Sequence, residues 1–243
     1  MEKTIGSKFM QESMCKNCGI SDRQKQLPPP MAELVYQEAD LIKLPEPDML
    51  DDKEVNFLEL IELRTSVRQY HDTSLSLKQL SYLLWCTQGV KMALPTGASL
   101  RTVPSAGARH ALETYLYINQ VEGLEAGLYR FVPLRHALIK LSGSEADDTA
   151  LAAAFLQQTM PNKCAVVFIW SAVLERMTYA YGQRAYRYLH LDAGHICQNL
   201  YLASQTIGFG TCAIGHFDDE KLNEFIGNDG EMQFVVYAAT VGK

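Results

Sequence analysis

The longest regular pattern in the chain covers residues 182–206, and it limits the possible folds more than any other segment. Apolar side chains recur there at steps of four and three, which is one face of an amphipathic helix. They are Leu189, Ala193, Ile196, Leu200, Ala203 and Ile207. Leu191, Tyr201 and Leu202 add apolar bulk on other sides. A helix at the centre of the core and a helix at a dimer seam both explain this pattern.

The same segment carries a polar stripe, formed by Arg184, Tyr188, Asp192, His195 and Asn199. A hydrogen-bonded network inside the core and a cavity lined by ligand-facing groups both fit this stripe. His190 and His195 lie about 140° apart around a helix, which disfavours a shared metal ion.

Shorter patterns predict the other elements. Helices are expected at 55–63, from Ser76 to Cys86, at 145–158 and at 218–226; strands are expected at 113–119, 164–170 and 233–241, with a hairpin over 127–141. Loops are expected at 89–107 and at the glycine-rich segment 208–218. Helices and strands mix without a regular βαβ alternation, so we expect an α+β fold.

The N-terminal residues differ from the rest. Residues 1–54 contain Pro28-Pro29-Pro30, a turn at Pro45-Glu46-Pro47 and the acidic run 51–54, with little periodicity. We therefore expect an irregular N-terminal arm over 1–54 and one folded domain over 55–243.

Charge and hydropathy exclude several classes of protein. The formal net charge is −6 and the isoelectric point is near 5.5, so we expect no nucleic-acid partner. The longest apolar run, 164–174, is far shorter than a bilayer span, and the N-terminus lacks the apolar core of a secretory signal. We expect a cytoplasmic protein without membrane association.

The cysteines predict no metal site. Cys15 and Cys18 form a lone CxxC without a second pair or histidines at ligand spacing. This pair is interpreted as incidental or weakly redox-active, with a metal or a functional disulfide as the alternative. The other four cysteines stand in apolar segments, where a thiol behaves as a small hydrophobe.

The first candidate site is Arg64-Thr65-Ser66-Val67-Arg68. In an extended segment positions 64, 66 and 68 point the same way, which places two guanidinium groups beside a hydroxyl. Arginine matches phosphate oxygens two at a time, so the trio suits a phosphate monoester. An ordinary arginine-rich helix end is the alternative.

Two loops form the other candidates. Pro104-Ser105-Ala106-Gly107 ends a loop of small residues, whose backbone donors can approach a flat ligand. The segment 208–218 is punctuated by glycines but lacks both GxxxxGK[ST] and GxGxxG. Its glycines therefore indicate close backbone approach rather than a known nucleotide fingerprint.

Together, in this order, these pieces resemble the FMN-dependent nitroreductase superfamily, specifically its SagB-type (thiazole/oxazole dehydrogenase-like) branch. The resemblance covers about residues 56–243 and rests on the four segments ELRTSVRQY, PSAGARHALETYLY, the stretch from YGQRAYRYLHLDAGH to FDDEKLNEFIG, and VVYAATVGK. It implies a mixed β-sheet sandwiched by helices, a long central helix and an intertwined homodimer with FMN sites at the interface.

The resemblance also assigns cofactor-binding residues. Arg64, Ser66 and Arg68 match the segment that holds the FMN phosphate and ribityl chain; Pro104, Ser105 and Ala106 match the segment that reaches the flavin of the partner subunit. Ile214, Gly215 and His216 match the loop near flavin N5. Tyr181, Arg184 and Tyr188 are candidates for the substrate side, and no nucleophile or metal ligand is expected.

The implied activity is hydride transfer in a ping-pong cycle, from NAD(P)H or a similar donor to a quinone, a nitroaromatic or another small acceptor. Azoline-oxidising relatives carry a Lys-Tyr pair where this chain has Ala180-Tyr181, which counts against thiazoline or oxazoline dehydrogenase activity. That activity and a non-catalytic flavin-binding role are the two alternatives. Many members also place a basic pair of a C-terminal extension against the phosphate; in this sequence we expect that this contact is missing or that Lys243 replaces it.

Overall fold

The computed structural model describes residues 4–47, 55–94, 98–141 and 147–243. The acidic run 51–54 and the first two residues of the helix predicted at 145–158 lie outside these ranges. So does the centre of the predicted loop 89–107, at residues 95–97.

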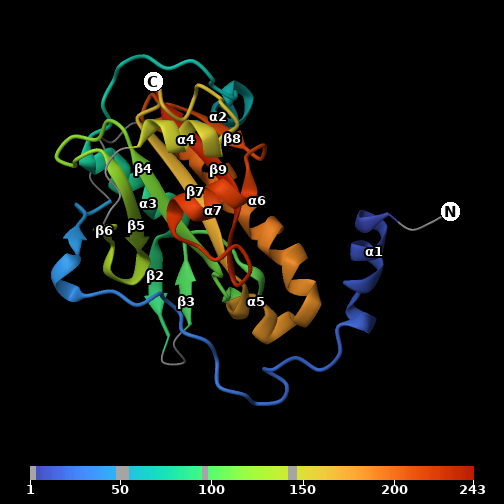
Figure 1. The fold of residues 1–243 in the computed structure, drawn as a ribbon. Helices are drawn as coiled ribbons and strands as arrows, with labels where there is room; N and C mark the ends of the chain where they lie inside the picture. The colour runs from blue at the N-terminus through green and yellow to red at the C-terminus, as the bar shows by residue number, and fades with distance from the viewer. Residues whose placement is uncertain (1–3, 48–54, 95–97, 142–146) are drawn as a thin grey trace.

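A seven-stranded sheet forms the middle of the described structure, in the order β1-β6-β5-β4-β7-β9-β8 (Figure 1). Its strands are β1 (Ile42–Lys43), β4 (Leu112–Ile118), β5 (Gly127–Val132), β6 (Ala137–Lys140), β7 (Val166–Val173), β8 (Gly210–Ile214) and β9 (Gln233–Gly242). Neighbouring strands pair antiparallel. The parallel pairing expected for a mixed sheet occurs in two isolated bridges, Ser66 with Thr211 and Leu75 with Val121.

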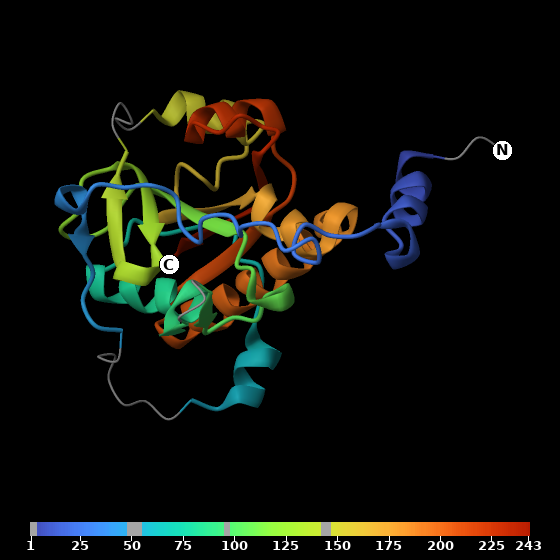
Figure 2. The same cartoon turned by 90° about the horizontal axis from the view of Figure 1, so that it is seen from below.

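Two layers of helices cover the sheet (Figure 2). One layer holds α3 (Leu77–Gln88) and α6 (Ala185–Thr206), and the other holds α4 (Asp148–Ala154) and α7 (Asp219–Ile226). The alternation of each strand divides its side chains between the two cores: Leu116 and Phe168 join the first, whereas Tyr117 and Val167 join the second. This arrangement confirms the predicted α+β sandwich.

The predicted helix over 182–206 is interrupted at its start. A short helix α5 (Leu174–Tyr181) ends at Gly182, which has a φ of +51°. One 3₁₀ turn, Gly182–Arg184, then leads into α6. Glycine adopts positive φ without a steric cost, so the chain can change direction here.

The apolar seam of α6 lies inside the core. Leu189, Ala193, Ile196, Leu200 and Ala203 are all buried against the sheet and α3. The central-helix interpretation of the seam is therefore correct for this face. The opposite face is uncovered within the described residues, and it consists of His190, Leu191, Gly194, His195 and Gln198.

Two segments that were predicted to be loops contain strands. The strands β2 (Val90–Ala93) and β3 (Ser99–Arg101), which pair antiparallel, lie within the predicted loop 89–107. Strand β8 occupies part of the predicted glycine-rich loop 208–218. The Val67 side chain packs so closely against Gly210 in this strand that a β-carbon at position 210 would overlap it. Helix α2 (Phe57–Leu63) agrees with the predicted helix at 55–63.

The N-terminal arm contains helix α1 (Ile5–Glu12), which stands away from the main body (Figures 1 and 2). The arm then crosses the molecule and ends in β1, which pairs with edge strand β6. Arginines of the domain hold it by its backbone: Arg130 donates to Leu34 and Val35, and Arg176 donates to the Met31 carbonyl at 2.8 Å. In the ranges that the structure covers, no helix is long and apolar enough to cross a membrane.

Candidate functional site

The segment 64–68 lies beside the first residues of the edge strand β8. The Val67 amide donates to the Thr211 carbonyl at 3.0 Å, and Ser66 forms a parallel bridge with Thr211. Arg64 follows directly on α2, so the helix end and the bridge together fix the direction of the segment.

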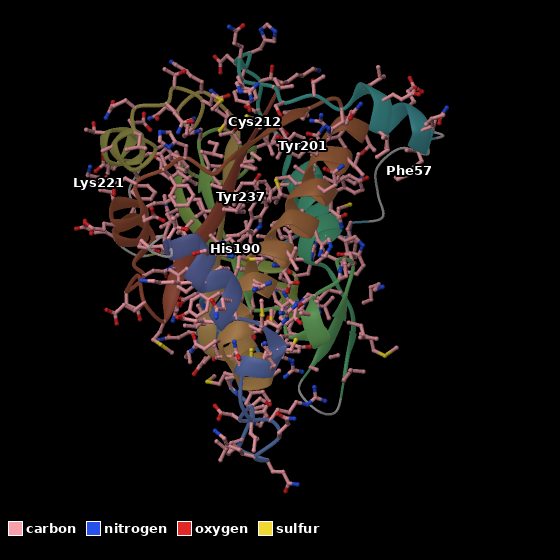
Figure 3. All side chains as sticks on the ribbon, turned by 90° about the vertical axis from the view of Figure 1, so that its right-hand side faces the viewer. Phe57, His190, Tyr201, Cys212, Lys221 and Tyr237 are labelled. Atoms are coloured by element: carbon pink, nitrogen blue, oxygen red, sulfur yellow. The ribbon has the colours of Figure 1, made fainter. Side chains whose placement is uncertain are left out.

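Tyr201 of α6, labelled in Figure 3, forms hydrogen bonds with both this segment and strand β8. Its hydroxyl lies 2.9 Å from the Ser66 hydroxyl and accepts a hydrogen bond from the Ala213 amide at 2.8 Å. The Arg64 guanidinium lies over the Tyr201 ring, 5.3 Å from its centroid, which is a cation–π distance. Arg64 and Ser66 therefore meet the same side chain, as the predicted alternation requires.

The positive charge of this segment is not neutralised locally. Neither Arg64 nor Arg68 has an acidic partner within the described residues, and Arg68 is exposed, donating only to the Ser66 carbonyl at 3.4 Å. Two unpaired guanidinium groups beside a hydroxyl are donors that suit a phosphate dianion. We call Arg64, Ser66, Arg68 and Tyr201 the phosphate clamp.

Ile214, Gly215 and His216, which match the loop near flavin N5, stand at the end of β8 and directly after it. Ile214 ends β8 and is buried, whereas Gly215 and His216 are exposed. The His216 carbonyl accepts a hydrogen bond from the Gln158 amide at 2.5 Å. Because the Ala213 amide is bound to Tyr201, the clamp and the start of this loop both lie beside edge strand β8.

The segment 104–106 is held at a different place, by Asp192 of α6. The Ser105 hydroxyl donates to the Asp192 carboxylate at 2.6 Å, and the Ala106 amide donates to the other carboxylate oxygen at 3.2 Å. The Ser105 oxygen also accepts from the His110 amide at 2.9 Å. Burial raises the pKa of Asp192, while the hydrogen bonds from Ser105 and Ala106 lower it. We call residues 104–110 the small-residue loop.

The three substrate-side candidates lie beside this loop. Tyr181 contacts Gly107 so closely that a β-carbon there would overlap its hydroxyl, and its ring meets Tyr188 edge-on with 4.7 Å between centroids. The Arg184 guanidinium donates to the Tyr188 hydroxyl at 2.9 Å and to the Ser13 carbonyl of the arm at 3.1 Å. Their substrate role remains a prediction.

The phosphate clamp and the small-residue loop lie on opposite flanks of α6. Asp192 and Tyr201 are nine residues apart, which is about two and a half helical turns and roughly 14 Å along the axis. The uncovered face with Leu191 and Gly194 lies between these flanks. One chain therefore presents the two parts of the predicted site on separate sides of its central helix.

The polar stripe of α6 is mainly a structural network. Arg184, Tyr188, Asp192 and Asn199 all have partners, the last donating to the Cys86 carbonyl at 2.9 Å, whereas His195 is exposed. The sequence did not reveal Tyr201 as part of the clamp, because a tyrosine in an apolar run gives no polar signal. The hydrogen bond between Ser105 and Asp192 was not predicted from the sequence either.

Among the described residues, no group of three histidine, cysteine, aspartate or glutamate side chains is placed to hold a metal ion. Cys15 and Cys18 are free thiols.

Comparison with known proteins identifies the family. The model of the nitroreductase family matches residues 61–243, so the chain belongs to this family of flavin-dependent oxidoreductases. A protein of Methanocaldococcus jannaschii named "Putative nitroreductase MJ1384" is 36% identical over 176 residues, which are 72% of this chain and 86% of that protein. The trifolitoxin-processing protein TfxB of Rhizobium leguminosarum is 33% identical over 134 residues, covering 53% of this chain but 36% of TfxB.

Solved structures agree with this assignment. A "putative nitroreductase" from Ralstonia eutropha superposes with a TM-score of 0.68 at 26% identity, over 89% of this chain and 94% of that one. A "putative nitroreductase" from Desulfovibrio desulfuricans, solved in complex with FMN, shares the fold with a TM-score of 0.53 at 17% identity; the match covers 78% of this chain and 87% of that one.

The contact between Gly107 and Tyr181 gives a testable prediction. Gly107→Ala should destabilise the small-residue loop, because φ at this position is +56° and the added methyl group meets the Tyr181 hydroxyl. Gly123→Ala is the matched control, since its φ is +81° but open space surrounds it. In thermal or urea unfolding, backbone strain alone should lower the free energy of unfolding of the control by about 1–2 kcal/mol.

Gly107→Ala should lower the free energy of unfolding more than the control does. Adding Tyr181→Phe to the Gly107→Ala chain should recover part of this difference. Equal losses at the two glycines would show that the tyrosine does not restrict this loop.

Proposed function

We propose that the chain binds FMN at the phosphate clamp and catalyses hydride transfer from NAD(P)H to a quinone, a nitroaromatic or a similar small acceptor. The observation that carries the proposal is the pair Arg64 and Arg68, which have no acidic partner among the residues that the structure describes and lie next to the hydroxyls of Ser66 and Tyr201. Family membership and the FMN complex of the D. desulfuricans protein support this choice of cofactor.

Each part of the chain has a distinct task in this proposal. Arg64, Ser66 and Arg68 bind the phosphate and ribityl oxygens, and the exposed Gly215 and His216 present their backbone near the reactive ring. FMN, when bound, supplies the hydride chemistry. Tyr181 and Tyr188 form an aromatic wall on the substrate side, and Arg184 holds Tyr188 in position through its hydrogen bond.

A homodimer is part of the proposal, because the small-residue loop and the clamp face opposite flanks of α6. A second copy seated on the uncovered α6 face would bring its loop 104–106 to the clamp of the first. Leu191 is 58% exposed on this face, and α2 adds the exposed Phe57 and Leu58. Exposed large apolar side chains of this kind mark protein interfaces.

A second candidate function is oxidation of a peptide azoline ring. The similarity to a protein named for processing trifolitoxin favours it, whereas Ala180 in place of lysine counts against it. Conversion of a thiazoline to a thiazole removes a hydride and a proton, so a base must accept the proton. Reduction of a quinone takes its protons from water and needs no such base.

The cofactor prediction is tested with clamp variants. Arg64→Gln or Arg68→Gln should weaken FMN binding by about one to two orders of magnitude, because each removes a charge-assisted phosphate contact. Fluorescence titration of the stripped protein measures the affinity, and mass spectrometry identifies the flavin released from the purified chain.

Arg135→Gln is the control, since Arg135 is an exposed arginine paired with Glu38 outside the clamp. Recovery of FAD, or unchanged affinity in both clamp variants, would contradict the assignment of this phosphate site.

The dimer prediction is tested at α6. Leu191→Glu should yield monomers near 27 kDa in light scattering and should lose FMN, because a carboxylate on this face would be buried without a partner at the interface. Met232→Glu, at a residue 50% exposed before β9, should leave the dimer intact. A wild-type monomer that retains FMN would refute the two-chain site.

The choice between the two activities is tested at Ala180. The unmutated chain should reduce a quinone with NADH or NADPH and should fail on a thiazoline peptide. Ala180→Lys should raise the rate of thiazoline oxidation by at most about 10²- to 10⁴-fold, the contribution of a positioned base. Ala180→Met should not raise this rate.

Efficient thiazole formation by the unmutated chain would instead establish the azoline activity. Failure on both substrates with FMN bound would assign the chain to non-catalytic flavin-binding proteins.

A further inference from the structure

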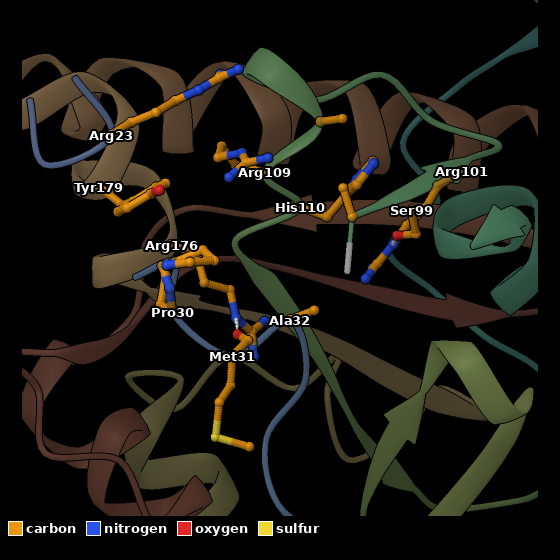
Figure 4. A pocket seen from close by; sticks show the side chains of 13 residues that line it. Arg23, Pro30, Met31, Ala32, Ser99, Arg101, Arg109, His110, Arg176 and Tyr179 are labelled. Carbon is orange, nitrogen blue, oxygen red and sulfur yellow. Dashed lines mark hydrogen bonds between the residues drawn. The ribbon is translucent and has the colours of Figure 1, made fainter. Parts of the chain in front are cut away.

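A cavity of about 360 Å³ lies between the N-terminal arm and the domain, away from the phosphate clamp (Figure 4). Its walls are formed by arm residues 23 and 29–32, by β3 and the residue before it, by residues 108–110 of the small-residue loop and by α5. The side chains that determine its character are Arg23, Arg101, Arg109, His110, Arg176 and Tyr179.

The lining is strongly cationic. Four arginines line the cavity, and no aspartate or glutamate does so among the described lining residues. Arg101 and Arg176 are buried, with 7% and 3% of their surface exposed. Burial lowers the pKa of Arg101 to about 10, so it stays protonated at neutral pH.

The surrounding acidic groups neutralise only part of this charge. Glu113 accepts from Arg176 at 2.6 Å and lies 3.8 Å from Arg130, so it is shared between two cations. Glu33 accepts from the Leu134 amide at 2.8 Å, and burial raises the pKa of its carboxyl. Arg23, Arg101 and Arg109 have no ion pair within the described residues.

One buried donor also lacks a partner. Arg176 donates through Nε to the Met31 carbonyl and through Nη1 to Glu113, but its Nη2 is buried and has no hydrogen-bond partner. Native structures rarely leave a buried polar group unsatisfied unless a water or a ligand binds it. His110 adds no charge, because burial and Arg101 lower its pKa to about 3.

We propose that this cavity binds a small, multiply charged oxyanion, through phosphate or carboxylate groups held by Arg23, Arg101, Arg109 and Arg176. Its volume falls within the range of small-molecule pockets and exceeds what a single inorganic ion needs. Guanidinium forks are the preferred partners of phosphate and carboxylate oxygens.

Binding at this cavity also fixes the N-terminal arm. The arm forms one wall and is attached there by hydrogen bonds: the Arg23 amide donates to the Tyr179 carbonyl at 2.9 Å, the Tyr179 hydroxyl donates to the Leu27 carbonyl at 3.0 Å, and the Met31 carbonyl accepts from Arg176. An anion that contacts both Arg23 and the domain arginines adds links across this boundary. The occupied cavity should therefore protect the exposed Lys25 from trypsin.

The test uses the full chain saturated with FMN, at low ionic strength, with pyrophosphate and citrate as probes in calorimetric titrations. Arg23→Gln and Arg109→Gln should each weaken binding about tenfold, the size expected for loss of one charge-assisted contact. Arg187→Gln is the matched control, because Arg187 also holds the arm, through Ser13 and Met10, but does not line the cavity.

Arg68→Gln separates this site from the phosphate clamp and should leave probe binding unchanged. Preference for pyrophosphate would assign a phosphate ligand, and preference for citrate a carboxylate ligand. The proposal is wrong if neither probe binds, if both cavity variants bind as the wild type does, or if only Arg68→Gln abolishes binding. At a probe concentration near the wild-type dissociation constant, the probe should also slow tryptic cleavage after Lys25 more in the wild type than in Arg109→Gln.

Discussion

The burial of α6 between the sheet and α3 is the constraint on which the rest of the site depends. The apolar seam from Leu189 to Ala203 fixes the rotation of this helix about its own axis. That rotation places Tyr201 on the flank facing β8 and Asp192 on the flank facing the small-residue loop. Both parts of the predicted flavin site are therefore positioned by one packing interaction, and the face between them is left for a partner.

Much of this arrangement could be predicted from local patterns. The 3.6-residue periodicity of α6 and the N-cap Ser76 predict helices, and the apolar run of β7 predicts a buried strand. The spacing of Arg64, Ser66 and Arg68 predicts a phosphate clamp, and the structure brings two of them to Tyr201. These features are local, so a single sequence contains the information.

Other features depend on contacts between distant segments. The glycines at 208, 210 and 215 predict a loop around β8, whereas its pairing with β9 and with the segment 64–68 makes it a strand. The arginines of the arm cavity come from four separate segments, so no spacing in the sequence indicates that they meet. The break at Gly182 requires a positive φ, which the helical pattern of the neighbouring residues conceals.

The most direct test of a site built from two chains is the flavin content of a hybrid dimer. One chain carries Arg64→Ala and Arg68→Ala, and the other chain, with a different tag, carries Gly107→Ala. The test requires that the homodimer of each variant binds no FMN. If the clamp of one chain joins the loop of the other, the hybrid contains one intact site and should bind one FMN per dimer. If each site lies within one chain, every site in the hybrid is defective, and a hybrid without FMN would contradict the account.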